Sequence, residues 1–225
     1  GMIMLGSLLA NIGYRTYMPR IPLLKELIIN EEIVTWFEHF YLWLLKEKRI
    51  SSKNISLIGM SFGGAMTLKM SIQKSIENFL PKSIFVYGSY YDLKAGLEFI
   101  VSGKIIIKGK IRNIEPNPWG LIVMFHNYLS RVDVGYDTVQ IQNIISLRIE
   151  DNEKEVVEEL KKITGKKKEL INCILNGKMN SEVLRIIKIF DKIMVNEYSS
   201  LSPSHWYEKI TSKVFIFHGA NDTMV

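Results

Sequence analysis

One serine in this chain has neighbours that could support nucleophilic chemistry. Ser61 lies two residues from Gly59 and from Gly63, and Gly64 follows, in the stretch ISLIGMSFGGA. This spacing is typical of a nucleophile elbow, in which a strand turns sharply into a helix. Glycines allow the backbone to approach where a side chain would collide, while the serine is held in a strained conformation. The pattern predicts a Ser61 hydroxyl that attacks a carbonyl, with the backbone N–H of Phe62 placed to hold the oxyanion.

The elements around the serine fit this interpretation. The apolar run Ile55–Ile58 predicts a strand, and the helix-prone run Ala65–Ile76 follows the glycines. The same pattern also fits an ordinary strand-to-helix turn in which Ser61 only caps the helix. A second stretch with matching chemistry is needed to separate the two interpretations.

That second stretch lies at the end of the sequence. Lys213–Phe217 reads as a strand, and it is followed by His218, Gly219 and Asp222. Together with the motif at Ser61, this arrangement resembles the α/β-hydrolase superfamily and its HG-x-x-D loop. The stretch GYRTYMPRIP, which begins at Gly13, also resembles a recurring segment of that superfamily.

The resemblance implies a serine hydrolase that acts on a carboxylic ester or a similar small acyl substrate. Ser61 would form an acyl-enzyme, and Asp222 would orient the imidazole that takes the serine proton. Asp92, which follows another predicted strand, is the alternative acid. The aromatic residues Phe62, Tyr90 and Tyr91 would suit a hydrophobic acyl or alcohol group. No cofactor and no metal are expected.

The general base has no obvious candidate in the sequence. In the superfamily the histidine follows the acid, but the four histidines of this chain are His39, His126, His205 and His218. We expect His218 to have a structural part at the base of its loop. Three explanations stay open: the sequence is a fragment, it is an inactive truncated product, or the base comes from a partner or an unusual position. A non-catalytic α/β-hydrolase-like binding or structural protein is therefore the alternative function.

The order of predicted elements favours an α/β fold. Up to about residue 92, helices alternate with strands, which indicates a mainly parallel sheet flanked on both faces by helices. We expect Met2–Asn11 to be a short buried helix, Tyr14–Met18 a strand, Asn30–Lys48 a helix packed on the sheet, and Ile84–Tyr87 a strand. An incomplete sheet of this kind would expose an edge, which a homodimer could pair.

The alternation then stops, and residues 93–210 read as mostly helical. Helices are predicted for five stretches: Trp119–Leu129, Asp137–Ile149, Asn152–Ile163, Lys166–Leu175 and Ser181–Asn196. By its position this segment resembles the cap or lid of a hydrolase. The predicted organisation is a hydrolase core of residues 1–92 and 211–225 with a helical cap of residues 93–210.

Composition narrows the class of protein. The chain has 225 residues and a net charge of +6, which we expect to be spread along it, so nucleic-acid binding is not predicted. The chain has one cysteine, Cys173, which excludes an intramolecular disulfide and favours a cytoplasmic location. We expect its side chain to be a buried, inert thiol. No apolar run approaches the length of about 18 residues that a membrane span needs.

Overall fold

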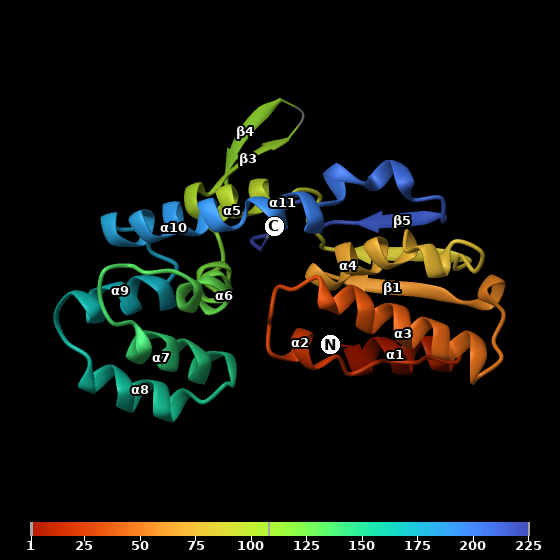
Figure 1. Cartoon of the computed structure of the whole chain (residues 1–225), viewed down its shortest axis with the longest axis horizontal. Helices are drawn as coiled ribbons and strands as arrows, with labels where there is room; N and C mark the ends of the chain where they lie inside the picture. Colours follow the sequence, from red (N-terminus) through yellow and green to blue (C-terminus); the bar gives the residue numbers. More distant parts are fainter. Residues whose placement is uncertain (1, 108, 225) are drawn as a thin grey trace.

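The fold contains a small parallel sheet. A computed structural model of the chain describes residues 2–107 and 109–224. Strands β1 (Ser56–Met60), β2 (Ser83–Tyr87) and β5 (Val214–Phe217) pair in the order β1-β2-β5, all in parallel (Figure 1). In this register Met60, Tyr87 and Phe217 are aligned. The carboxyl ends of the three strands therefore lie at one edge of the sheet, and the prediction of an α/β fold with a parallel sheet is confirmed.

Helices cover one face of this sheet. Helix α4 (Phe62–Ser71) packs on β1 and β2, and helix α3 (Glu32–Lys46) packs on α4. Two 3-10 turns, η4 (Pro203–His205) and η5 (Tyr207–Lys209), lead into β5. A small buried cluster lies between this face and the elements that cover it: Ile84 and Val86 of β2, Leu68 of α4, and Trp206 between η4 and η5.

The other face of the sheet is bare in the part of the chain that the structure describes. Of the side chains that point there, Ile58, Met60, Tyr87 and Phe217 are exposed, while Phe85 and Phe215 stack on each other and are half-buried. Successive side chains along a strand point to opposite faces of the sheet. The helices next to the sheet pack on the face that α4 covers. The expectation that helices flank both faces is therefore wrong for the described residues.

The N-terminal helix forms where predicted, but it is not buried. Helix α1 (Met2–Asn11) leaves Ile3 77% and Leu8 55% exposed. Its residues are almost all apolar, so the sequence contains no polar face to indicate which side would meet water. The expected strand 14–18 is irregular chain. The remaining short elements of this half are α2 (Pro22–Lys25), η1 (Ser52–Asn54) and η2 (Lys74–Ile76).

Residues 93–210 are mostly helical, with one hairpin that was not expected. The elements are α5 (Leu93–Ser102), β3 (Lys104–Ile107), β4 (Lys110–Asn113), α6 (Trp119–Tyr128), η3 (Leu129–Arg131), α7 (Val139–Ile149), α8 (Glu153–Lys162), α9 (Gly165–Leu175), α10 (Ser181–Ile193) and α11 (Val195–Leu201). Strands β3 and β4 pair in an antiparallel ribbon that extends from the body (Figure 1). The alternation of this short lysine-dotted run was too brief to separate strand from helix.

The helical segment shares one hydrophobic core with helices α3 and α4, while Ile84 and Val86 of β2 belong to a second, smaller cluster. A single cluster of buried side chains runs from Ile33 on α3 to Ile186 on α10. Hydrogen bonds also join residues 93–210 to the rest of the chain: Asn127 Oδ1 accepts the N–H of Ile29 at 2.6 Å, and the Tyr90 hydroxyl donates to the Leu201 carbonyl at 3.1 Å. Within the described residues, no helix is both long and apolar enough to cross a membrane.

Candidate functional site

Ser61 occupies the turn between β1 and α4 in a strained conformation. Its φ is 49° and its ψ is −133°, and its side chain is exposed. A positive φ is uncommon for a residue with a side chain and persists only where the surrounding structure enforces it. Here the enforcing contact is a hydrogen bond of 2.9 Å from the Ser61 N–H to the Tyr87 carbonyl of the neighbouring strand.

Two of the three predicted glycines are sterically required. A Cβ on Gly59 would lie 2.7 Å from the Cα of Gly64 and 2.8 Å from the carbonyl oxygen of Gly63. A Cβ on Gly64 would lie 2.8 Å from the Cβ of Ser89. At Gly63 the nearest atoms would be 3.9 Å away, which is ordinary van der Waals contact. The expectation that all three glycines avoid a collision is therefore wrong for Gly63.

The first turn of α4 has free donors close to the serine. Of its first N–H groups, that of Gly64 bonds to the Ser61 carbonyl and that of Ala65 to Ser89 Oγ, at 2.9 and 3.0 Å. The N–H groups of Phe62 and Gly63 have no intrahelical acceptor, and no other described residue accepts from them. Helix N-termini favour negative charge. The structure thus places two unpaired donors beside Ser61 where one, from Phe62, was predicted.

The loop after β5 lies at the same edge of the sheet. His218 Nε2 is 3.5 Å from Asp222 Oδ2, and Asp222 Oδ1 accepts the N–H of Met224 at 2.9 Å. Gly88, between the two loops, has a φ of +55°, and a Cβ there would come within 3.4 Å of Asp222 Oδ2. With strands about 4.8 Å apart, the backbones at Ser61 and His218 are about 10 Å apart across β2. Asp222 therefore meets a histidine, but it is the one that we expected to be structural.

Asp92, the alternative acid, already has partners. It is the N-cap of α5, where Oδ1 accepts the Ala95 N–H at 2.9 Å, and Oδ2 accepts the Ser204 hydroxyl at 2.7 Å. Burial acts to raise the pKa of Asp92, but these hydrogen bonds and the nearby His205 outweigh it and hold the pKa below its usual value. Capping accounts for this carboxylate without a catalytic role.

The aromatic residues near the turn differ in their exposure. Phe62 stacks on Tyr90 with ring centroids 5.9 Å apart, and the buried Tyr90 donates its hydroxyl to the Leu201 carbonyl. Burial raises the pKa of Tyr90. Tyr91 is exposed and lies against Tyr207. Phe62 and Tyr90 thus connect the turn at Ser61 with helix α11, while Tyr91 lies at the surface.

The other candidate groups have structural explanations. His126 Nε2 is 3.1 Å from the Glu26 carbonyl, and burial lowers the pKa of this histidine, although that contact opposes the shift. Cys173 is half-buried, and burial raises the pKa of its thiol. A thiol with a raised pKa is a weak nucleophile at neutral pH.

One buried lysine, on the helix that follows Ser61, was not predicted from the sequence. Lys69 lies on α4 and is almost fully buried, with its ammonium bonded to Glu31 Oε1 at 2.5 Å and to Ser200 Oγ at 2.9 Å. It also contacts the Ser200 carbonyl. A lysine within the apolar stretch AMTLKMS is the signal that could have revealed it, because a buried charge needs partners. The contacts tie α4 to α3 and α11.

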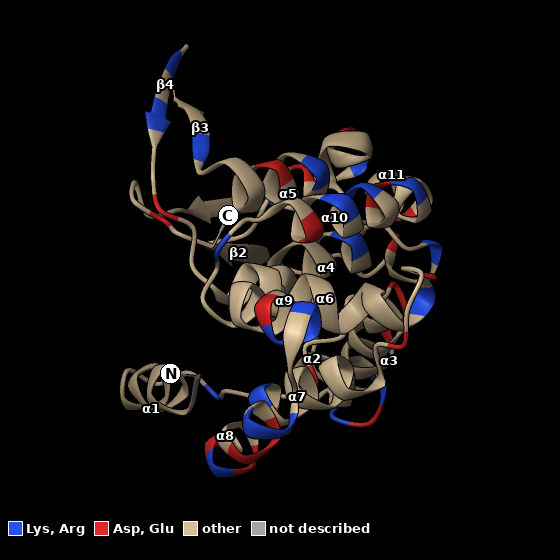
Figure 2. Cartoon of the chain, turned by 90° about the vertical axis from the view of Figure 1, so that its left-hand side faces the viewer, with Lys and Arg blue, Asp and Glu red and all other residues tan. Residues whose placement is uncertain are grey.

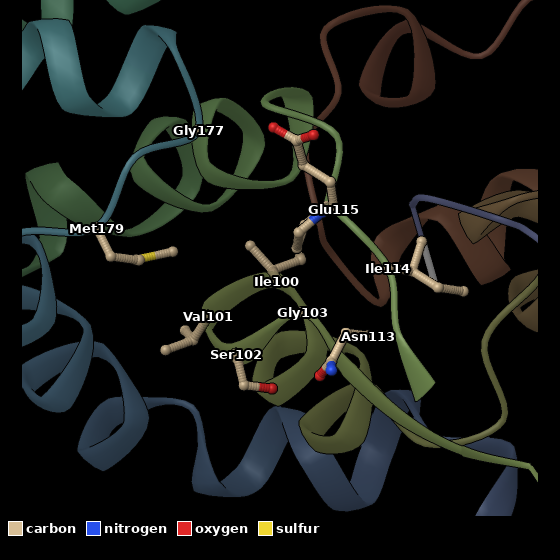
Figure 3. Close-up of a pocket in the computed structure, with 10 residues that line it drawn as sticks. Ile100, Val101, Ser102, Gly103, Asn113, Ile114, Glu115, Gly177 and Met179 are labelled. Carbon is tan, nitrogen blue, oxygen red and sulfur yellow. The ribbon is translucent and has the colours of Figure 1, made fainter. Parts of the chain in front are cut away.

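Two hollows lie near the hairpin. One, of about 300 Å³, is lined by Ile105 and Ile107 of β3 and by His218, Gly219, Ala220 and Asp222. The other, of about 450 Å³, lies between the end of α5, the chain after β4 and the turn before α10. Figure 3 shows Ile100 in the middle of this second hollow, with Met179 directed toward it. Only the first hollow includes a predicted site residue, Asp222, and no group of metal-binding side chains occurs among the described residues.

Comparisons with known proteins do not identify the chain. No family model, no curated protein and no solved structure matches it.

Proposed function

We propose that this protein is a serine hydrolase of the α/β-hydrolase type, acting on a carboxylic ester or similar acyl compound. The observation that carries the proposal is the conformation of Ser61: a non-glycine residue at a positive φ, exposed, at the carboxyl end of a parallel strand. Strain of this kind is found where the surroundings over-determine the backbone, and it clusters at active sites. In proteins with parallel sheets, ligands bind at the edge formed by the carboxyl ends of the strands, and Ser61 lies at that edge.

The reaction would start with attack of Ser61 Oγ on the substrate carbonyl. The unpaired N–H groups of Phe62 and Gly63 would stabilise the oxyanion, since they are donors at a helix N-terminus. The tetrahedral intermediate would then collapse and expel the alcohol, which leaves with the proton that Ser61 lost, and water would hydrolyse the acyl-enzyme to release the acid. The ring of Phe62, beside these donors, would favour an apolar substituent on the substrate.

Asp222 would orient the imidazole that accepts the serine proton. Among the described residues, His218 is the histidine paired with a carboxylate, through its Nε2 and Asp222 Oδ2. Paired with Asp222, its imidazole would be stabilised as it becomes positively charged. In this scheme residues 93–210 form the cap, and the hollow beside Ile105 and Ile107 is the part of the site that it encloses.

A covalent probe tests the proposal. The full chain and its Ser61→Ala variant are treated with a fluorophosphonate, and the labelled protein is measured by mass spectrometry. We expect one label, lost in Ser61→Ala and kept in Ser204→Ala, a control serine whose hydroxyl donates to Asp92. Equal labelling of the chain and Ser61→Ala, or none at all, would contradict the proposal.

The alternative is a non-catalytic binding protein with the same architecture. It is favoured by the observation that, within the described residues, Ser61 Oγ makes no hydrogen bond to a histidine, while His218 is directed to Asp222. A chain of this kind would remain unlabelled in the experiment above and would still bind an acyl compound, as measured by calorimetry.

A further inference from the structure

Two segments project from the same side of the molecule. In Figure 2 the β3–β4 hairpin extends at the upper left and helix α1 at the lower left, with β2 of the sheet between them. We call the outer surfaces of α1 and the hairpin the projecting face. Neither element has a large part of its outer surface covered by another described element.

The projecting face is apolar. On the hairpin, Ile106 and Ile111 lie directly opposite each other across the two strands and are 74% and 67% exposed. The neighbouring Ile105 and Ile107 point the other way and line the hollow beside His218. The outward pair therefore contributes nothing to the attachment of the hairpin. Exposed apolar patches on projecting elements mark sites of interaction.

The hairpin and the chain that follows α1 carry basic residues without acidic ones. Residues 2–25 and 99–114 contain seven of the 29 lysines and arginines and none of the 23 acidic residues. The rest of the chain keeps 22 basic residues against 23 acidic ones. The basic residues are Arg15, Arg20, Lys25, Lys104, Lys108, Lys110 and Arg112, of which Lys108 lies outside the described residues. On the projecting face itself the described charges are Lys104, Lys110 and Arg112 of the hairpin, because α1 has no charged side chain.

We propose that the projecting face binds the surface of a bilayer that contains anionic lipid. Exposed apolar side chains enter the boundary between headgroups and acyl chains, and basic residues beside them are attracted to anionic headgroups. The side chain of Tyr14, just after α1, is also exposed, and tyrosine is a residue that favours the level of the lipid headgroups. Both elements lie on one side, so a flat surface can meet them together.

Other occupants fit the face less well. A second copy of the chain, placed symmetrically, would bring the same positive segments together, which is repulsive. A nucleic acid would pair with the charges but would leave Ile106 and Ile111 exposed to water. A lipid surface satisfies both the charge and the apolar side chains. The proposal does not depend on the chemistry of Ser61.

Vesicle flotation with the full chain tests the proposal. We expect the protein to float with phosphatidylcholine vesicles that contain about 30% phosphatidylserine and to stay unbound with pure phosphatidylcholine. Binding should fall when NaCl is raised from about 0.1 M to about 0.5 M, because salt screens the attraction. The Ser61→Ala variant should bind as the unmodified chain does.

Variants separate the two contributions. Lys110→Glu with Arg112→Glu should weaken binding about tenfold or more, and Ile106→Ser with Ile111→Ser should do so as well. The matched control is Lys188→Glu with Lys192→Glu on α10, which changes charge equally at exposed positions away from the projecting face. All three double variants should melt at the temperature of the unmodified chain, since these side chains are exposed.

Three results would overturn the proposal. The first is equal binding to neutral and anionic vesicles, and the second is an equal loss in the α10 control. The third is absence of vesicle binding together with a dimer, seen by sedimentation, that the isoleucine variants abolish. In that last case the face would be an interface between copies of the chain.

Discussion

The turn after β1 and the loop after β5 lie at one edge of the sheet, yet they are held in different ways. At the turn, backbone atoms approach so closely that Gly59 and Gly64 admit no Cβ. At the loop, His218 is exposed, and a Cβ on Gly219 would have its nearest neighbour at 3.9 Å. Both β1 and β5 are edge strands of the described sheet, but the end of β1 packs against α4, which determines the backbone at Ser61, whereas the loop after β5 keeps more freedom.

The difference predicts where substitutions will affect folding. The turn should respond strongly to added volume, and the loop should respond weakly to loss of its polar contacts. Three measurements of the free energy of unfolding, from the largest expected change to the smallest, can confirm or contradict this contrast.

The strongest effect is expected at Gly59. Gly59→Ala should destabilise the protein by about 3 kcal/mol or more, because the added Cβ meets backbone atoms that cannot move aside. Urea unfolding followed by circular dichroism measures the change. Gly63→Ala is the matched control: with 3.9 Å of space and a helical position, it should stabilise the protein by up to about 1 kcal/mol. Equal losses in the two variants would show that the turn is not selectively packed.

A smaller effect is expected at the ion pair behind the turn. Glu31→Gln should cost about 1–2 kcal/mol, because Lys69, with 11% of its side chain exposed, loses a charged partner but keeps its contacts with Ser200. The 58% exposure of the Glu31 side chain limits the effect through solvent screening.

The same pair predicts a dependence on pH. Burial acts to raise the pKa of Glu31, but the hydrogen bonds from Lys69 and Ser200 and the charge of Lys69 hold it below its ordinary value of 4.5. A depressed pKa in the folded state contributes stability that is present above 4.5 and is lost as the pH falls through the lower folded value. The difference between the unmodified chain and Glu31→Gln should therefore shrink in acid. A constant difference from neutral to acidic pH would exclude the charge of Glu31 as its cause.

The smallest effect on stability is expected in the loop. His218→Gln should change the free energy of unfolding by less than about 0.5 kcal/mol, because an exposed pair at 3.5 Å contributes little. Phosphonate labelling of Ser61 should slow at least about a hundredfold in the same variant if His218 is the base. His205→Gln, also exposed, is the control for labelling. A large loss of stability in His218→Gln would remove the contrast between turn and loop, and unchanged labelling would exclude His218 as the base.

Much of the fold was evident from local sequence. The periodicity of apolar residues and the positions of glycine and proline predicted β1, β2, β5 and the helices α6 to α10 within a few residues. Each of these elements is long or strongly apolar. The hairpin of β3 and β4 was missed, since four-residue strands carry little periodicity. At the site, the sequence predicted the strand-to-helix turn at Ser61 and the loop acid Asp222, but not that His218 would lie beside Asp222.

What the sequence by itself determined is the local chemistry: a serine between glycines at the end of a strand, and an aspartate in a loop after another strand. What only the tertiary structure decided is which groups meet. The close approach of Ser89 that excludes a side chain at Gly64, the pairing of Lys69 with Glu31, and the hydrogen bond from Ser204 to Asp92 all join segments that are distant in the sequence. The placement of α1 and the hairpin on one side also depends on the tertiary structure, because separate segments become one surface only when packing places them together.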